Sequence, residues 1–206
     1  MKKLTVPALV VLIILIGGST GLARYRIKDL YIKPAEDYGA HQDFQNVIIG
    51  AYPYGTQGST LELFDTETLH RRHILPVLVV VENYNDFAIR IHEQDVVLIT
   101  QDGLRFPSLP YQVVLLHISN QPLTTDSTQP ESLRRIVGKE MAMDFENKAF
   151  GEKQIAPGNS DFGVVFFWLP EIGNLPGSRL YLPDIVNLSE GEQLMSFEFE
   201  LGRPQE

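Results

Sequence analysis

The chain has 206 residues, a formal net charge of −9 and no cysteine. Without cysteine there can be no disulfide bond, thiolate nucleophile, Cys-based metal site or lipid attached through cysteine. Residues 34–206 carry 11 basic and 25 acidic side chains, a net charge of −14. Because such a surface repels phosphate backbones, the charge argues against a nucleic-acid partner.

Residues 4–23 form an uncharged stretch of twenty residues ahead of the acidic region. About twenty apolar residues in a helix, each rising 1.5 Å, cross the hydrocarbon core of a membrane. We therefore expect residues 1–23 to be one N-terminal transmembrane helix, or an uncleaved signal, followed by a juxtamembrane neck (24–43) and a domain (44–206). The residues expected to form the anchor are Leu4, Val10, Ile14, Ile16, Gly17, Gly18 and Gly21.

A cleaved secretory signal is the alternative for the same stretch. Lys2 and Lys3 give it a basic start, and Gly21 and Ala23 place small residues at the −3 and −1 positions of a cleavage site. In either case the order of basic and apolar regions predicts export of the domain. For the anchored form we expect a single pass through the inner (cytoplasmic) membrane, with the N-terminus in the cytoplasm and the domain in the periplasm or outside.

Three basic residues follow the apolar stretch directly. Arg24, Arg26 and Lys28 are expected to contact lipid headgroups, because long basic side chains at the end of a membrane span reach back to the interface.

Short apolar runs separated by turn residues make up the rest of the chain. Residues 45–54 read as a strand that ends at Pro53, and residues 61–69 alternate imperfectly. Residues 74–81 (ILPVLVVV) and 162–169 (FGVVFFWL) are apolar on both strand faces, which predicts two buried strands, and we place residues 74–81 at the centre of the fold. Residues 83–86 supply turn chemistry and predict a hairpin into residues 87–91. Further strands are expected at 95–100, 111–118, 138–145, 180–186 and 194–201, and one short helix at 131–137, opened by Pro130.

This pattern indicates an all-β fold, an antiparallel β-sandwich preceded by the transmembrane helix. Residues 76–98 combine an apolar strand, an Asn83-Tyr84-Asn85 turn, an alternating strand and the run VVLI, and a Pro157-Gly158 turn precedes residues 162–169. This arrangement resembles the immunoglobulin-like β-sandwich of membrane-anchored bacterial domains. The resemblance implies a fold and no activity.

Candidate chemistry is sparse in this sequence. His70 and His73 flank two arginines that repel a cation, so we expect a solvated loop there rather than a metal site. Asp65 and Glu67 could pair as in glycoside hydrolysis, but no large aromatic cleft accompanies them. No glycine loop for phosphate and no metal-binding motif is found, so we expect no cofactor and no enzyme.

Aromatic residues in and beside two loops are the best candidates for contact with a partner: Tyr52, Tyr54, Phe106 and Tyr111. The first hypothesis is a non-enzymatic, single-pass membrane protein whose domain is an extracytoplasmic accessory or assembly subunit of a larger complex. Its partners would be membrane lipid and other membrane protein subunits. The alternative is a cleaved, exported, soluble β-sandwich that binds a small ligand or polymer.

Overall fold

The computed structural model describes residues 25–172, 175–183, 185–194 and 196–201. The seven expected anchor residues and Arg24 lie outside these ranges. No helix within the ranges is both long enough and apolar enough to cross a membrane. The described chain is mostly β, with eleven strands in antiparallel sheets and five α-helices.

In chain order the elements are η1 (Ala35–Asp37), β1 (Ala40–Phe44), β2 (Val47–Pro53), α1 (Gln57–Phe64), α2 (Thr68–Arg71), β3 (Ile74–Asn83), β4 (Ile89–His92), η2 (Glu93–Asp95), β5 (Val97–Ile99), β6 (Arg105–Pro107), α3 (Tyr111–Ile118), α4 (Pro130–Val137), α5 (Lys139–Lys148), β7 (Glu152–Ile155), β8 (Ser160–Trp168), β9 (Arg179–Leu182), β10 (Val186–Asn187) and β11 (Phe197–Glu200).

The central sheet has the strand order β1-β2-β3-β8, and every pairing in it is antiparallel. β3 is buried along almost its whole length because β2 and β8 flank it and other elements cover both of its faces. β8 pairs with it from Glu82↔Ser160 to Ile74↔Trp168. Both predicted strands are confirmed. β3 lies inside the sheet, as expected, whereas β8 is its last strand and is buried from residue 163 to residue 167.

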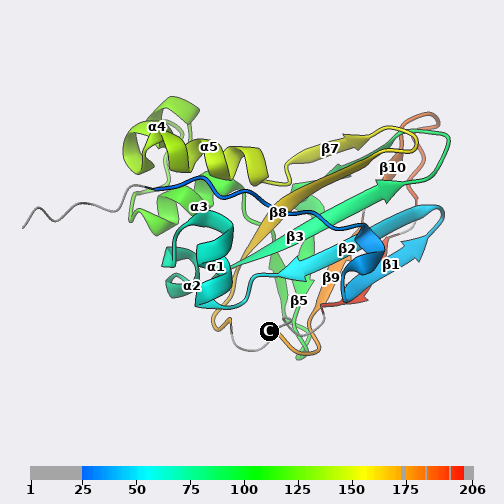
Figure 1. Cartoon of the computed structure of the whole chain (residues 1–206), viewed down its shortest axis with the longest axis horizontal. Helices are drawn as coiled ribbons and strands as arrows, with labels where there is room; N and C mark the ends of the chain where they lie inside the picture. The colour runs from blue at the N-terminus through cyan, green and yellow to red at the C-terminus, as the bar shows by residue number, and fades with distance from the viewer. Residues whose placement is uncertain (1–24, 173–174, 184, 195, 202–206) are drawn as a thin grey trace, which may run out of the picture.

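Two cores lie on opposite faces of this sheet (Figure 1). Alternate residues of β3, such as Val77 and Val79, face a strand layer made of the sheets β10-β4-β7 and β11-β9-β5-β6. The residues between them, such as Leu78 and Val80, face a helix layer made of α1 to α5. Antiparallel sheets on both sides of one apolar core agree with a β-sandwich, to which the helix layer is added on the outer face.

Glycine allows two close approaches of backbone to the central sheet. A Cβ at Gly50 on β2 would lie 2.3 Å from the carbonyl oxygen of Ala35, so η1 can rest directly on the strand. A Cβ at Gly163 on β8 would lie 2.3 Å from the Cα of Phe150, where the chain leaving α5 joins β8 through the Phe150 N–H to Val164 O hydrogen bond (3.0 Å). Both positions therefore require glycine.

Two predicted strands are helices, and those predictions are wrong. Residues 111–118 form α3, which starts after Pro110 and is followed by Asn120 at a φ of 57°. Residues predicted as a strand at 138–145 lie mostly in α5, whose buried residues Ala142, Asp144, Phe145 and Lys148 have the spacing of one helix face. Apolar alternation over so short a window fits both periods, and the strong helix formers Lys, Glu, Met and Ala favour the helix.

Residues 61–69, whose apolar alternation is imperfect, are divided between α1 and α2. α1 begins in a capping box, in which Thr56 Oγ1 accepts a hydrogen bond from the Ser59 N–H (3.1 Å). It ends at Asp65, which has a left-handed φ of 48°. The helix expected at 131–137 is confirmed as α4, with Pro130 in its first turn.

The predicted hairpin between residues 74–81 and 87–91 is wrong as well. β4 leaves the central sheet and pairs with β7 and β10 in the strand layer. The turn is held by Asn83, whose amide donates to the carbonyl oxygens of Phe87 (2.8 Å) and Ile155 (3.0 Å). Asn83 is 1% exposed, so its buried amide needs these partners. Its hydrogen bonds fix the path of the chain from β3 in the central sheet to β4 in the strand layer.

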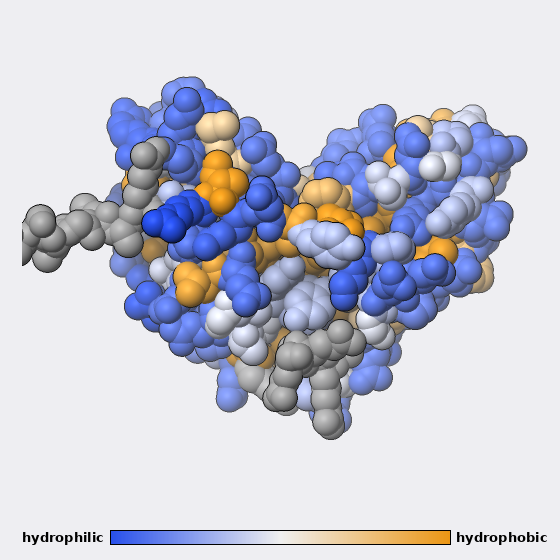
Figure 2. All heavy atoms as spheres, viewed as in Figure 1, coloured by the Kyte–Doolittle hydropathy of each residue, from blue (hydrophilic) through white to orange (hydrophobic). Residues whose placement is uncertain are grey.

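Residues 25–34, which are half of the expected neck, cross the helix-layer side of the molecule without regular secondary structure (Figure 1). We call this segment the N-terminal strap. Leu30 and Ile32 pack on the helix-side core, and the Ala35 N–H at its end donates to Glu82 Oε1 on β3 (3.1 Å). Figure 2 shows a mainly hydrophilic face with apolar groups gathered toward its middle.

Candidate functional site

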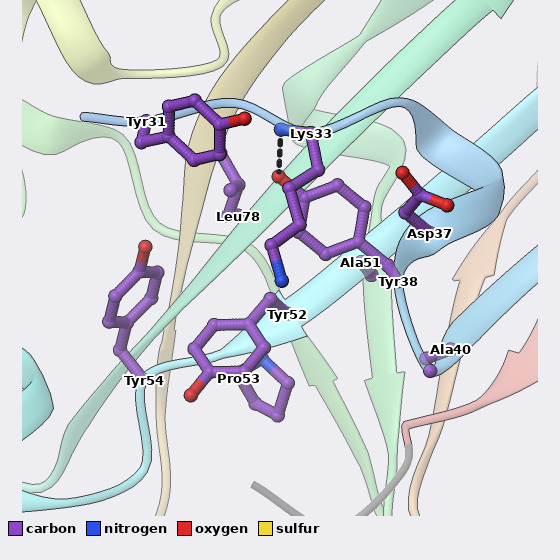
Figure 3. Close-up of a pocket in the computed structure, with 11 residues that line it drawn as sticks. Tyr31, Lys33, Asp37, Tyr38, Ala40, Ala51, Tyr52, Pro53, Tyr54 and Leu78 are labelled. Carbon is purple, nitrogen blue, oxygen red and sulfur yellow. Dashed lines mark hydrogen bonds between the residues drawn. The ribbon is translucent and has the colours of Figure 1, made fainter. Parts of the chain in front are cut away.

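A pocket of about 140 Å³ lies between the strap and β2 (Figure 3). Four of its lining residues are tyrosines: Tyr31 of the strap, Tyr38 after η1, Tyr52 of β2 and Tyr54 just beyond that strand. We call it the tyrosine pocket. Its walls come from segments about twenty residues apart in the sequence, which meet because η1 and the strap fold back over β2.

Tyr52 and Tyr54 are two residues apart and therefore project from the same face of the chain at the end of β2. Their rings meet edge to face, with centroids 5.0 Å apart and planes at 84°. This is the favoured geometry of an aromatic pair, so each ring holds the other in place. Burial raises the pKa of the Tyr54 hydroxyl, which therefore remains a neutral donor at physiological pH.

Tyr38 forms the back of the pocket. Its side chain is 7% exposed, and its hydroxyl accepts a hydrogen bond from the backbone N–H of Lys33 (3.1 Å). This bond ties the strap to the segment after η1. Tyr31, in contrast, is 82% exposed at the rim, where it is free to contact a ligand.

Lys33 gives the pocket a positive charge. Its side chain extends from the strap toward the ring of Tyr52, and Asp37, the one acid among the lining residues, points away from the ammonium (Figure 3). Within the described ranges no carboxylate forms an ion pair with Lys33. The pocket therefore combines aromatic walls with an unneutralised cation, which suits a ring that carries or neighbours a negative charge.

The size of the pocket limits what it can hold. Cavities that enclose whole drug-sized ligands measure about 300–1,000 Å³. A cavity of about 150 Å³ takes a single benzene-sized ring. At about 140 Å³, the tyrosine pocket has room for one ring or side chain and not for a complete cofactor.

The four predicted partner residues occupy three places. Tyr52 and Tyr54 line the tyrosine pocket. Phe106 lies on β6 and lines a separate pocket of about 170 Å³ beside Leu104. Tyr111 is the first residue of α3, where it packs on the helix-side core and burial raises the pKa of its hydroxyl. The sequence thus identified one wall of the tyrosine pocket, and it missed Tyr31, Lys33 and Tyr38.

Two of the residues expected at lipid headgroups are described, and both lie at Asp65, the residue that ends α1. The Arg26 N–H donates to Asp65 Oδ2 (2.8 Å) and Lys28 Nζ pairs with Asp65 Oδ1 (3.0 Å). These contacts hold the pKa of Asp65 below its usual range. The Lys28 side chain keeps 37% of its surface exposed.

A second, polar pocket of about 350 Å³ lies at η2, lined by His92, Glu93, Ser108 and Glu152 among others. Glu93 Oε1 is buried and has no hydrogen-bond partner within the described chain. Burial raises the pKa of this carboxyl to about 7, while a hydrogen bond from Gly151 and the charge of Lys153 act in the opposite direction. No aromatic wall accompanies these groups, so the pocket is a poorer ligand site than the tyrosine pocket.

Metal binding finds no support in the described ranges, where no three His, Asp or Glu side chains come close enough together to hold an ion. His70 lies on α2 and His73 follows it at a φ of 60°. Arg71 between them pairs with Glu67 (3.8 Å), so this segment is a short, charged helix and turn rather than the expected loop.

No family model matches the chain, and no curated protein matches it. Among solved structures, the yjhA protein from Bacillus subtilis aligns over 78% of this chain and 95% of its own, with 11% identity and a TM-score of 0.46. The ycdA protein from Bacillus subtilis subsp. subtilis strain 168 aligns over 62% of this chain and 29% of its own, with 13% identity and a TM-score of 0.33. Both scores are below 0.5, so neither similarity assigns a fold family or a function.

Proposed function

We propose that this chain is a non-enzymatic, single-pass membrane protein and an accessory subunit of a membrane complex. Residues 4–23 anchor it in the inner membrane, with the N-terminus in the cytoplasm and the β-rich domain on the other side. The domain is an immunoglobulin-like sandwich in this proposal. That finer description is supported by antiparallel strands on both sides of the strand-side core.

In this proposal the companion chain binds at the tyrosine pocket, and this pocket is the main structural support for the proposal. It offers three half-buried or exposed tyrosine rings and the Lys33 ammonium around a space for one ring. An aromatic side chain of another membrane subunit, next to an acidic residue, fits that chemistry. Tyrosine is enriched in protein interfaces because it buries a large area at little cost in conformational entropy.

The first test is the intact mass of the protein recovered from native membranes in mild detergent, with co-eluting chains recorded. A mass that includes residues 1–23, together with stoichiometric companion chains, is the expected result. A soluble chain that begins at Arg24 and elutes alone would refute the anchored subunit and favour the exported ligand-binding domain.

The second test places a photocrosslinking amino acid at position 31, on the pocket rim. Position 84 is the matched control, because Tyr84 is also an exposed tyrosine (62%) but lies at the other end of the central sheet. We expect a crosslink to a companion chain from position 31 only, and a loss of at least tenfold in yield when Lys33→Glu reverses the pocket charge. Equal yields at the two positions would exclude the tyrosine pocket as the contact.

A further inference from the structure

The start of the N-terminal strap is attached to the helix layer at a fixed place. The Tyr25 hydroxyl donates to Asp144 Oδ2 on α5 (2.6 Å), and Asp144 is 1% exposed and also pairs with Lys148 (2.8 Å). One residue later, the Arg26 N–H binds Asp65 at the end of α1. Two such contacts in succession fix both the position and the direction of the strap at its start.

This place lies within a very short distance of the apolar stretch. Residues 4–23 end two residues before Tyr25. An extended chain spans at most about 3.6 Å per residue, so Tyr25 lies within roughly 7 Å of the end of that stretch. A domain tethered so closely brings the surface around Tyr25 to the membrane, and that surface is the helix layer (Figure 1).

The charge is unevenly distributed between the helix layer and the rest of the domain. The strap and the helix layer with its connections (residues 25–34, 57–73 and 111–148) contain nine Lys or Arg and nine Asp or Glu. The remaining residues up to 201 (35–56, 74–110 and 149–201) contain four Lys or Arg and sixteen Asp or Glu, a net charge of −12. An anionic surface repels this acidic part far more strongly than it repels the neutral helix layer.

The helix layer also exposes the side chains that an interface between water and lipid accepts. Arg71, Arg135 and Lys139 are exposed there, and long basic side chains can reach phosphate groups. Two large apolar residues are exposed on the same part of the molecule, Ile27 of the strap (53%) and Leu123 in the connection between α3 and α4 (62%).

We propose that the helix layer is a membrane-facing surface that rests on anionic phospholipid headgroups, while the acidic strand layer points away from the membrane. The proposal rests on the anchoring of residues 4–23 given above, and it adds a defined orientation of the domain.

The experiment uses the full-length chain in vesicles of phosphatidylcholine and phosphatidylglycerol at a ratio of three to one. Since the chain has no cysteine, single cysteines can carry a fluorophore at Thr125→Cys, beside α4, or at Ser189→Cys, beside β10. Headgroup spin-labelled lipid quenches a nearby fluorophore. We expect at least threefold more quenching at position 125 than at 189, and a smaller ratio in pure phosphatidylcholine or at 0.5 M salt.

Charge reversal identifies the contacting side chains. Arg135→Glu with Lys139→Glu is expected to reduce the quenching ratio at least twofold, whereas Arg105→Glu on β6 leaves it unchanged. Flotation with the vesicles is measured on every sample. Equal quenching at both positions in floated protein would overturn the orientation alone, and failure to float would overturn the anchoring together with the orientation that depends on it.

Discussion

Asp144 is only 1% exposed inside the helix layer, so its buried carboxylate needs partners for both of its oxygens. Lys148 Nζ pairs with Oδ1 and also donates to the carbonyl oxygen of Leu63 (2.7 Å), while the Tyr25 hydroxyl satisfies Oδ2. A buried ion pair adds stability only when its remaining hydrogen-bonding groups are satisfied. Tyr25 therefore completes this network from the strap.

Tyr25→Phe should destabilise the protein by about 1–3 kcal/mol, because it removes a donor from a buried carboxylate and leaves the ring in place. Urea unfolding measures the change. Tyr84→Phe is the control, since its hydroxyl bonds Glu82 Oε2 (2.9 Å) at an exposed site, and its cost should stay within about 0.5 kcal/mol. Equal losses of unfolding free energy in the two variants would show that the Asp144 network has no special role in stability.

Glu93→Gln should stabilise the protein in a pH-dependent way. The unfolded carboxyl ionises near pH 4.3, whereas burial raises the pKa of Glu93 to about 7 in the native state. Between these values the native state binds more protons than the unfolded state, so wild-type stability falls as the pH rises toward 7. Glutamine does not ionise, so the variant lacks this pH-dependent fall in stability.

We expect Glu93→Gln to have a higher melting temperature than the wild type at pH 8 and the same melting temperature at pH 4. The difference at pH 8 corresponds to at most about 3 kcal/mol in the free energy of unfolding. Thermal unfolding followed at both pH values checks this. A constant difference across the pH range would indicate that the carboxyl titrates normally.

Gly163 shows how one element depends on another. Gly163→Ala places a Cβ 2.3 Å from the backbone of Phe150, so β8 or the chain after α5 must move. Because β8 is buried at this point and pairs with β3 along its whole length, we expect a loss of at least about 2 kcal/mol in urea unfolding. Gly58→Ala in α1, where no atom lies within 4 Å, should be neutral or stabilising by up to about 1 kcal/mol. A neutral Gly163→Ala would contradict the close contact.

The elements that could be predicted from the sequence are those whose pattern is long and unambiguous. β3 and β8 are apolar on both faces, and α4 begins at a proline, so all three were predicted. α3 and α5 were missed because eight to ten residues of mixed apolar pattern satisfy both periods. What decides them is the need to cover the outer face of the central sheet, which is a tertiary effect.

The candidate site divides in the same way. Tyr52 and Tyr54 were predicted because both stand next to a strand end with turn residues behind it. Tyr31, Lys33 and Tyr38 could not be assigned to the same place, because only the packing of Ala35 against Gly50 brings the strap over β2. The alternation of Leu30, Tyr31 and Ile32 was the one local signal of an extended, half-buried segment.

At the scale of the whole molecule, one strand joins two cores. Leu78 (1% exposed) faces the helix layer and Val79 (0%) faces the strand layer, so neither core can open without exposing β3. We therefore expect a single cooperative transition, with far-ultraviolet circular dichroism and the fluorescence of Trp168 changing together. Leu78→Ala should lower the stability by about 2–5 kcal/mol and keep the two signals coincident. Loss of the helical signal ahead of the fluorescence would show that the helix layer unfolds on its own.

The strap has a mechanical consequence for a protein held at one end. In the anchored protein that we propose, a pull on the chain from the membrane reaches Tyr25 and Arg26 first, and these contacts break one after another rather than all at once. Force would therefore peel the strap before it loads the paired strands, which share many hydrogen bonds along β3. The ten released residues reach at most about 34 Å when extended, so the released strap would take up small movements of the proposed anchor while the central sheet stays folded.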